Sequence, residues 1–244
     1  VGCRNNLDIV DTDATEPTVM ATISSSSANT PVGSSTKKAL LIQSNSSSSM
    51  AVSPDGSLAV AVNPDSDSIT IIDAISLESI AEISVGDNPI AVSITPDSRN
   101  ALVANYDSAT LSVIDLNQRK QIAQYGVGQM PYGVVTDGIH GFITEFGTSS
   151  VSVIDLNTGG LLTRIRVDPF PSGIALSQNA EKLLITHLFT GKITVIDVST
   201  RTIIGMASTG ADTNLSQFIV IDHEGEKAYI PQTRSNATNM ALLF

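Results

Sequence analysis

The sequence predicts an all-β fold, specifically a β-propeller, and three observations support this prediction. A five-residue pattern of apolar, hydroxyl, β-branched, Ile and Asp residues recurs four times, ending at Asp73, Asp115, Asp155 and Asp197. The intervals between these Asp residues are 42, 40 and 42 positions. Turn signals separate short strand-like segments at a spacing of roughly 8 to 12 residues. A fixed internal period of this length is typical of stacked supersecondary units.

Each repeat contains four short segments with strand character, which we call A to D. Segment C is the five-residue pattern itself, which is rich in β-branched residues and therefore favours a strand. Segment B precedes it, as in Ala-Leu-Val-Ala-Asn at 101–105, and follows an A–B turn such as Thr-Pro-Asp-Ser at 95–98. Segment D leads into a turn that often contains Pro, as at 128–131. Four antiparallel strands per repeat make one propeller blade.

The B segments also favour a propeller over a β-sandwich. Apolar residues run without interruption through 101–104, which indicates a strand buried on both faces. Blades stack face to face around an axis, so their inner strands are buried in this way. A sandwich also contains short strands and turns, but it gives no reason for a 42-residue repeat.

The length of the repeat sets the expected number of blades. The 195 residues from Met50 to Phe244 correspond to between four and five repeats. We therefore expect an incomplete arc, with four full blades and part of a fifth, within a propeller domain at 38–244. Residues 1–37 are expected to form a separate start and a Ser-rich tether.

Composition excludes several classes of function. The formal net charge is −11 and the basic residues are scattered, whereas nucleic-acid binders concentrate Lys and Arg on one face. We therefore expect no nucleic-acid partner. The chain has no Trp and one cysteine, so neither an intrachain disulfide nor a Cys-based metal cluster can form. We expect no cofactor and no metal, and no apolar run approaches the roughly 18 residues needed to span a bilayer.

Cys3 predicts a lipid anchor. A small residue, Gly2, precedes this cysteine and polar sequence follows it, which resembles the end of a bacterial lipobox. The cysteine would then be the lipidation site, and the protein would be extracytoplasmic, at the cell surface or in the periplasm. The alternative is a free surface thiol.

The repeat resembles that of the YVTN family of β-propellers. The resemblance rests on B segments that end in Asn at Asn63 and Asn105, on Ala228-Tyr229, and on the Val-Ile-Asp segments. It covers Met50 to about Asn239, although most B segments lack the aromatic residue. The resemblance implies a seven-bladed ring outside the cytoplasm. Related folds include lactonase-type enzymes and electron-transfer proteins.

The ends of the B segments predict a ligand-binding face. The residue at this position is polar but changes from repeat to repeat: Asn63, Asn105, Glu145, His187 and Gln232. The B–C and D–A connections emerge on one face of a propeller, so these residues should form a ring near its channel. Tyr106, Phe146 and Tyr132 would add apolar contact. Glu145 and His187 could share a proton or a metal ion; alternatively, the ring residues cap strand ends and face channel water.

Other acidic and histidine residues favour structural roles. The Asp that ends each C segment should accept backbone N–H bonds in the C–D turn. His140 and His223 are expected in A–B turns, opposite to His187, so the three histidines should not share a metal ion. The segment 8–13, with three Asp residues, lacks the Gly and Glu of an EF-hand calcium loop and suits a strand or tether better.

The sequence favours a non-catalytic binding or scaffold module, whose partner is a protein or small molecule on the propeller face. The alternative is the propeller part of a larger enzyme, either a haem-containing redox protein or a lactonase-like hydrolase. The segment 229–236 departs from the repeat and resembles a segment of larger propeller proteins that carry haem domains.

Overall fold

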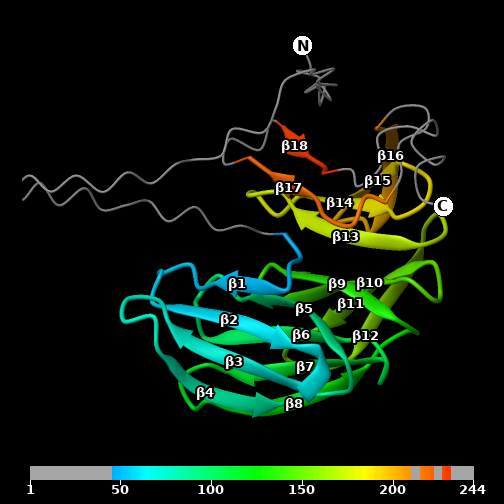
Figure 1. Ribbon diagram of the computed structural model, residues 1–244. Helices are drawn as coiled ribbons and strands as arrows, with labels where there is room; N and C mark the ends of the chain where they lie inside the picture. Colours follow the sequence, from blue (N-terminus) through cyan, green and yellow to red (C-terminus); the bar gives the residue numbers. More distant parts are fainter. Residues whose placement is uncertain (1–45, 210–214, 223–226, 232–244) are drawn as a thin grey trace, which may run out of the picture.

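The computed structural model describes residues 46–209, 215–222 and 227–231. It contains four four-stranded antiparallel sheets, each formed by strands consecutive in the chain, and one two-stranded sheet. The sheets follow one another around a common axis (Figure 1). The protein is therefore a β-propeller, and its described part is an incomplete one, as the repeat predicted. The calls on 1–37, Cys3, His223 and Gln232 lie outside the described residues.

The four full blades contain strands of similar length, in the order A, B, C, D from the axis outward. Blade 1 comprises β1 (Met50–Val52), β2 (Leu58–Asn63), β3 (Ser68–Asp73) and β4 (Ser79–Ser84), with the short 3-10 turn η1 (Pro64–Ser66) between β2 and β3. Blade 2 comprises β5 (Pro89–Ile94), β6 (Asn100–Asn105), β7 (Thr110–Asp115) and β8 (Lys120–Gly126). Blade 3 comprises β9 (Pro131–Thr136), β10 (His140–Glu145), β11 (Ser150–Asp155) and β12 (Leu161–Arg166). Blade 4 comprises β13 (Pro171–Leu176), β14 (Lys182–His187), β15 (Lys192–Asp197) and β16 (Thr202–Ser208), and the two-stranded sheet pairs β17 (Val220–Ile221) with β18 (Ala228–Tyr229).

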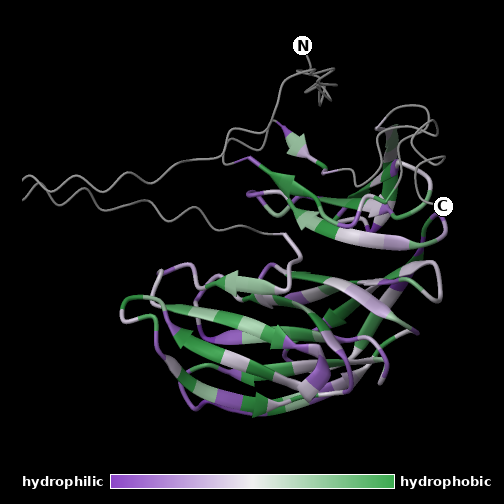
Figure 2. Cartoon of the chain, in the orientation of Figure 1, coloured by the Kyte–Doolittle hydropathy of each residue, from purple (hydrophilic) through white to green (hydrophobic). Residues whose placement is uncertain are grey.

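Each pair of neighbouring blades encloses an apolar layer. Between blades 2 and 3, for example, Leu102, Leu111, Val134 and Ile143 are fully buried against one another. Inner strands are apolar on both faces because each face meets a different blade, and Figure 2 shows hydrophobic residues along the strands with polar residues at the turns. Burying an aliphatic side chain of this kind contributes roughly 1.5–3 kcal/mol.

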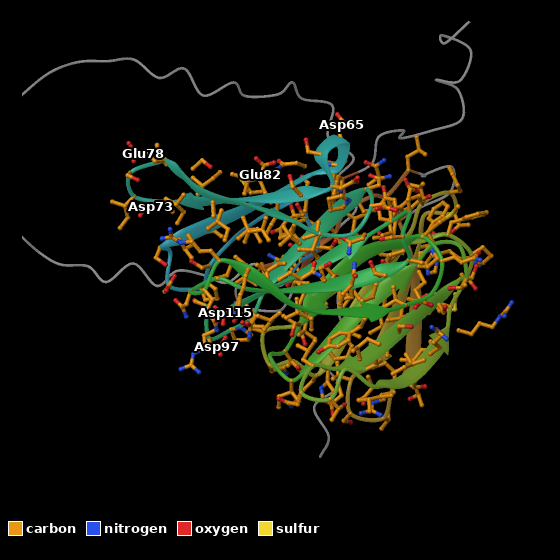
Figure 3. The ribbon with its side chains drawn as sticks, turned by 90° about the horizontal axis from the view of Figure 1, so that it is seen from below. Asp65, Asp73, Glu78, Glu82, Asp97 and Asp115 are labelled. Atoms are coloured by element: carbon orange, nitrogen blue, oxygen red, sulfur yellow. The ribbon has the colours of Figure 1, made fainter. Side chains whose placement is uncertain are left out.

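The Asp at the end of each C strand caps the following turn, as predicted. Asp73 accepts hydrogen bonds from the backbone N–H groups of Ile75 and Ser76, at 2.9 and 2.8 Å. Equivalent bonds reach Asp115, Asp155 and Asp197. These bonds hold the pKa of Asp73 below its usual value. Figure 3 shows Asp73 and Glu78 at one end of blade 1 and Asp65 at the other, so the C–D and B–C turns lie on opposite faces.

The chain crosses the axis before it enters blade 1. Ser46 forms a bridge to Ala175 in β13, and Ser48 forms one to Val92 in β5. The Ser47 N–H donates to the Ile174 carbonyl at 2.9 Å, and the Val92 N–H donates to the Ser48 carbonyl at 2.8 Å. Residues 46–49 therefore connect the innermost strands of blades 4 and 2.

Candidate ligand-binding site

The loops of one face of the propeller, the B–C and D–A loops, carry all the aromatic loop residues of blades 1 to 4. Seven such loops link the strands of blades 1 to 4, at 64–67, 85–88, 106–109, 127–130, 146–149, 167–170 and 188–191. Four of these loops carry an aromatic residue, namely Tyr106, Phe146, Phe170 and Phe189. The A–B and C–D loops of the same blades carry none. This face, which we call the aromatic face, is the one on which the sequence placed a ligand.

Five aromatic rings form a continuous row across blades 2, 3 and 4. Tyr106 meets Tyr132 edge-on at 6.4 Å between ring centroids, and Tyr132 stacks on Phe146 at 5.8 Å. Phe170 lies 5.1 Å from both Phe146 and Phe189. Phe170 and Phe189 are 41% and 51% exposed, although burying such rings is favourable. The other three rings are partly buried, and exposed apolar rings grouped in this way are typical of a contact surface.

A pocket of about 260 Å³ opens at the blade 2 end of this row. Three aromatic rings line it, together with two aliphatic side chains and several polar groups: Ser47, Ser48, Ser49, Asn88, Ile90, Ala91, Tyr106, Tyr132, Gln217 and Phe218. These residues come from blade 2, from blade 3, from the segment that crosses the axis and from the segment before β17. A concave, mainly apolar site with a few polar groups is the usual form of a small-molecule site.

Tyr132 is the residue that joins the pocket to the aromatic row. From its position on β9 it makes a T-shaped contact with Tyr106 and a stacked contact with Phe146. Burial raises the pKa of Tyr132 above its ordinary value, and the neighbouring Tyr106 phenol adds to the effect. Tyr132 therefore remains a neutral phenol near pH 7 and can donate a hydrogen bond to a ligand.

The B-strand ends lie where the sequence placed them, at Asn63, Asn105, Glu145 and His187. Each described member of this ring bonds to hydroxyl groups near the start of its own C strand. Asn63 donates to Ser68 and Thr70, and Asn105 donates to Thr110 and Ser112. The amide donors of both Asn residues are thus committed inside their blades. The residue at this position varies from blade to blade, and its bonding partners vary with it. Such bonds are those expected if the ring residues cap the ends of their strands.

Glu145 is the most strongly held member of the ring. Its carboxylate is fully buried and accepts bonds from the Gly128 N–H at 2.6 Å, from Ser150 at 2.6 Å, from Thr148 at 2.9 Å and from Ser152. Burial on its own raises the pKa, but these hydrogen bonds outweigh it and leave the pKa below its ordinary value. Glu145 is therefore a carboxylate that ties the D–A loop between blades 2 and 3 to the C strand of blade 3.

His187 is also buried, and its bonds define its tautomer. Its Nδ1 lies 3.1 Å from the Pro169 carbonyl, which can only accept, so Nδ1 carries the hydrogen. Its Nε2 then accepts from the Thr194 hydroxyl at 2.8 Å. Burial lowers the pKa of His187, which favours the neutral ring. The hydrogen bonds described for His187 and Glu145 do not join the two residues.

Asn105 leaves one polar atom without a partner among the described residues. Its Oδ1 is buried and accepts no hydrogen bond, while its Nδ2 serves two hydroxyls. In blade 3, Glu145 Oε1 accepts from the Gly128 N–H, whereas the Asn105 atom beside Gly86, the residue equivalent to Gly128, is Nδ2. Exchanging the amide nitrogen and oxygen of Asn105 would place Oδ1 beside Gly86, as Glu145 Oε1 lies beside Gly128.

Histidine and acidic groups form no metal centre in the described part of the chain. No group of three or more His, Cys, Asp or Glu side chains there is arranged to hold an ion. His140, expected in an A–B turn, is instead the first residue of β10, and its Nδ1 lies 2.9 Å from an Asp137 oxygen. Within the same ranges, no helix is long and apolar enough to cross a membrane.

Comparisons with known proteins support the fold. No family model matches the chain, and no curated protein matches it. Among solved structures, it is similar to the hydrazine synthase of Kuenenia stuttgartiensis, with a TM-score of 0.70, 21% identity, and coverage of 84% of this chain and 59% of that one. It is also similar to the Cps50 (Swd1) β-propeller domain of Myceliophteria thermophila, with a TM-score of 0.66, 14% identity, and coverage of 75% and 62%.

A third similar structure is a functionally unknown protein from Desulfotomaculum acetoxidans, with a TM-score of 0.59, 14% identity, and coverage of 73% and 59%. The chain thus spans about three fifths of the length of each of these structures. At these identities the similarity defines the class, a β-propeller, and does not define an activity.

Proposed function

We propose that the protein is a non-catalytic β-propeller binding module that captures a small molecule, or a small group of a larger partner, in the pocket beside Tyr106 and Tyr132. The observation that carries the proposal is the coincidence of the pocket with the aromatic row on the face where the loops meet. The A–B and C–D loops offer no such rings. Glu145 supports the pocket because it accepts from the Gly128 N–H, in the loop at 127–130 that leads to Tyr132.

The test is a ligand-observed NMR screen of a fragment library against the purified protein. The double variant Tyr106→Leu/Tyr132→Leu should lose most of the fragment signals, because it removes two of the three rings that line the pocket. The control is Tyr125→Leu, which changes a tyrosine on β8 that contacts Gly159 in a C–D turn of the opposite face. Fragments that bind the double variant as well as the unchanged protein would contradict the proposal.

We further propose an extracytoplasmic location with a lipid anchor at Cys3. The support is the lipobox-like Gly2-Cys3, the Ser-rich stretch after it, and the resemblance of the repeat to extracytoplasmic YVTN propellers. In the native host, Cys3→Ser should move the protein from the membrane fraction to the soluble fraction. A Cys3→Ser protein that remains with the membranes would refute the anchor.

A second candidate function is that of a propeller unit in a larger enzyme. It is favoured by the similarity to hydrazine synthase, of which this chain matches 59% of the length. Two assays on the full gene product test it. A pyridine haemochrome spectrum would detect bound haem, and turnover of simple lactones would detect a hydrolase; a negative result in both would exclude these two alternatives.

A further inference from the structure

The pocket lies beside an uncompensated negative charge. Three B–C and D–A loops, two that line it at 85–88 and 106–109 and one that is bonded to Asn88 at 64–67, contain four carboxylates and no Lys or Arg: Asp65, Asp67, Asp87 and Asp107. All four are exposed. Among the described residues, none of them belongs to an ion pair. No ion pair in the described ranges therefore neutralises the negative charge of these loops.

Two of these carboxylates directly contact a residue that lines the pocket. The Asn88 side-chain amide donates to Asp107 Oδ2 at 3.1 Å, and the Asn88 N–H donates to Asp67 Oδ1 at 2.8 Å. Asn88 is thus held by one carboxylate from each of two B–C loops. The negative charge thus contacts the lining of the cavity through one residue, and screening by salt acts over a Debye length of about 8 Å at physiological ionic strength.

The lining of the pocket itself suits an apolar cation. The rings of Tyr106 and Tyr132 are inclined at 76°, so they present surfaces in two directions, and Phe218 adds a third ring that is 42% exposed. The face of an aromatic ring attracts a cation. Ile90 and Ala91 offer aliphatic contact for alkyl groups in the same cavity.

The rest of the aromatic face differs in charge. Around Phe146, Phe170 and Phe189, the acidic residue in the loops is Asp168, and its carboxylate lies 2.7 Å from Lys192 Nζ. That pair neutralises itself. Aromatic rings and unpaired carboxylates therefore come together at the pocket and separate along the remainder of the row.

From this juxtaposition we infer that the pocket binds a small organic cation, an ammonium group that carries apolar substituents. This inference rests on the proposed binding function and specifies the chemistry of its ligand. The cationic centre packs against the rings of Tyr106, Tyr132 and Phe218, and the carboxylates behind Asn88 supply the long-range attraction. An anionic ligand would face the same carboxylates and be repelled.

The experiment compares choline with 3,3-dimethylbutan-1-ol, which has the same shape without the charge. Binding is followed by isothermal titration calorimetry and by tyrosine fluorescence, which is free of interference because the chain has no Trp. Choline should bind at least about tenfold more tightly than the alcohol, a difference of about 1.4 kcal/mol. Its affinity should fall as NaCl is raised from 0.05 to 0.5 M, roughly as screening predicts.

Variants separate the ring contribution from the charge contribution. Tyr132→Leu should weaken choline binding about tenfold, within the usual range of a cation–aromatic contact. Asp107→Asn keeps an acceptor for Asn88 but removes one charge, and it should weaken choline about threefold without changing the affinity of the alcohol. Asp168→Asn is the matched control on the same face, and it should leave choline binding unchanged.

The outcomes distinguish this inference from the proposed function. Equal affinity for choline and the alcohol would overturn the inference and leave the binding function standing. Choline binding that Asp107→Asn and Asp168→Asn weaken equally would overturn it as well, since the attraction would then come from net charge. If choline fails to bind while neutral fragments bind at Tyr106 and Tyr132, the inference fails alone. If nothing binds there, both proposals fail.

Discussion

Replacing Glu145 by Ala removes the most connected polar group in the described structure. Its carboxylate accepts from the Gly128 N–H, which belongs to the D–A loop, and from the hydroxyls of Thr148, Ser150 and Ser152. Arg164 Nε lies 3.5 Å from the same carboxylate. The carboxylate is thus the common acceptor for two loops and one strand, and all of its bonds are buried or partly buried.

The expected loss follows from the donors left without an acceptor. Thr148 and Ser150 lie 2.8 Å apart and can bond to each other, whereas the Gly128 N–H and the Ser152 hydroxyl lose their acceptor inside the protein. An unpaired buried donor costs about 1–3 kcal/mol. Glu145→Ala should therefore lower the free energy of unfolding by about 3 kcal/mol. Glu145→Gln keeps an acceptor for Gly128 and should cost about 1 kcal/mol.

Urea unfolding followed by far-ultraviolet circular dichroism measures both losses. The control is Glu78→Ala, an exposed residue in a C–D turn, which should change stability by less than about 0.5 kcal/mol. If Glu145→Ala is no less stable than Glu145→Gln, the carboxylate does not hold the D–A loop, and the structural reasoning about the polar ring is refuted.

Three further predictions concern the same ring and the pocket. The pKa of Glu145 is lower in the folded protein than the value near 4.3 of an unfolded chain. The stability that ionised Glu145 contributes is therefore present above that pH and is lost as the pH falls through the folded pKa. The urea midpoint of Glu145→Gln should accordingly fall less than that of the unchanged protein between pH 5 and 3. The pKa of His187 is also lowered, so the imidazole of the unfolded chain is protonated first as the pH falls below about 6.5. This preference destabilises the folded protein, and His187→Asn should therefore reduce the loss of stability between pH 7 and 5. An unaltered pH profile would contradict the buried neutral ring. Gly173→Ala would place a methyl carbon 2.7 Å from the Gln217 carbonyl oxygen and 2.9 Å from Phe218 Cα, so it should weaken fragment binding as well as stability, and normal binding would show that the segment before β17 does not shape the pocket.

Local features of the fold could be read from the sequence because the repeat defines them. The B strands end at Asn63, Asn105, Glu145 and His187, and the C strands end at the repeated Asp, as the pattern predicted. Turn capping by Asp73 and its equivalents depends on residues two or three positions away. Such short-range contacts recur in every blade, so one repeat explains the others.

The pocket could be predicted only in part. Tyr106 and Tyr132 follow from their place in the repeat, since both lie near loops on one face. The contributions of Ser47, Gln217 and Phe218 could not be foreseen, because they come from segments outside the regular blades that meet blades 2 and 3 across the axis. Sequence periodicity carries no information about such contacts.

The polar ring shows a second limit. The residue at this position differs from blade to blade, which suggested a ligand site. The residues that bond to it differ from blade to blade as well, so the variation also has a structural explanation. Asn105 meets two hydroxyls, whereas Glu145 meets three hydroxyls and an N–H group. These partners lie on another strand or in a loop, so a scan of single positions does not reveal them. Ligand contact by the ring remains a prediction, and Glu145→Ala/His187→Ala tests it by binding.

The central claim, that ligands bind at the aromatic face, is tested most directly by NMR of the protein labelled with ¹³C-tyrosine. The chain has four tyrosines, so four ring signals report from four places: Tyr106, Tyr125, Tyr132 and Tyr229. Titration with choline, or with the tightest fragment from the screen, should shift the signals of Tyr106 and Tyr132 and leave those of Tyr125 and Tyr229 unchanged. Shifts confined to Tyr125 or Tyr229, with Tyr106 and Tyr132 unmoved by any bound ligand, would contradict the claim.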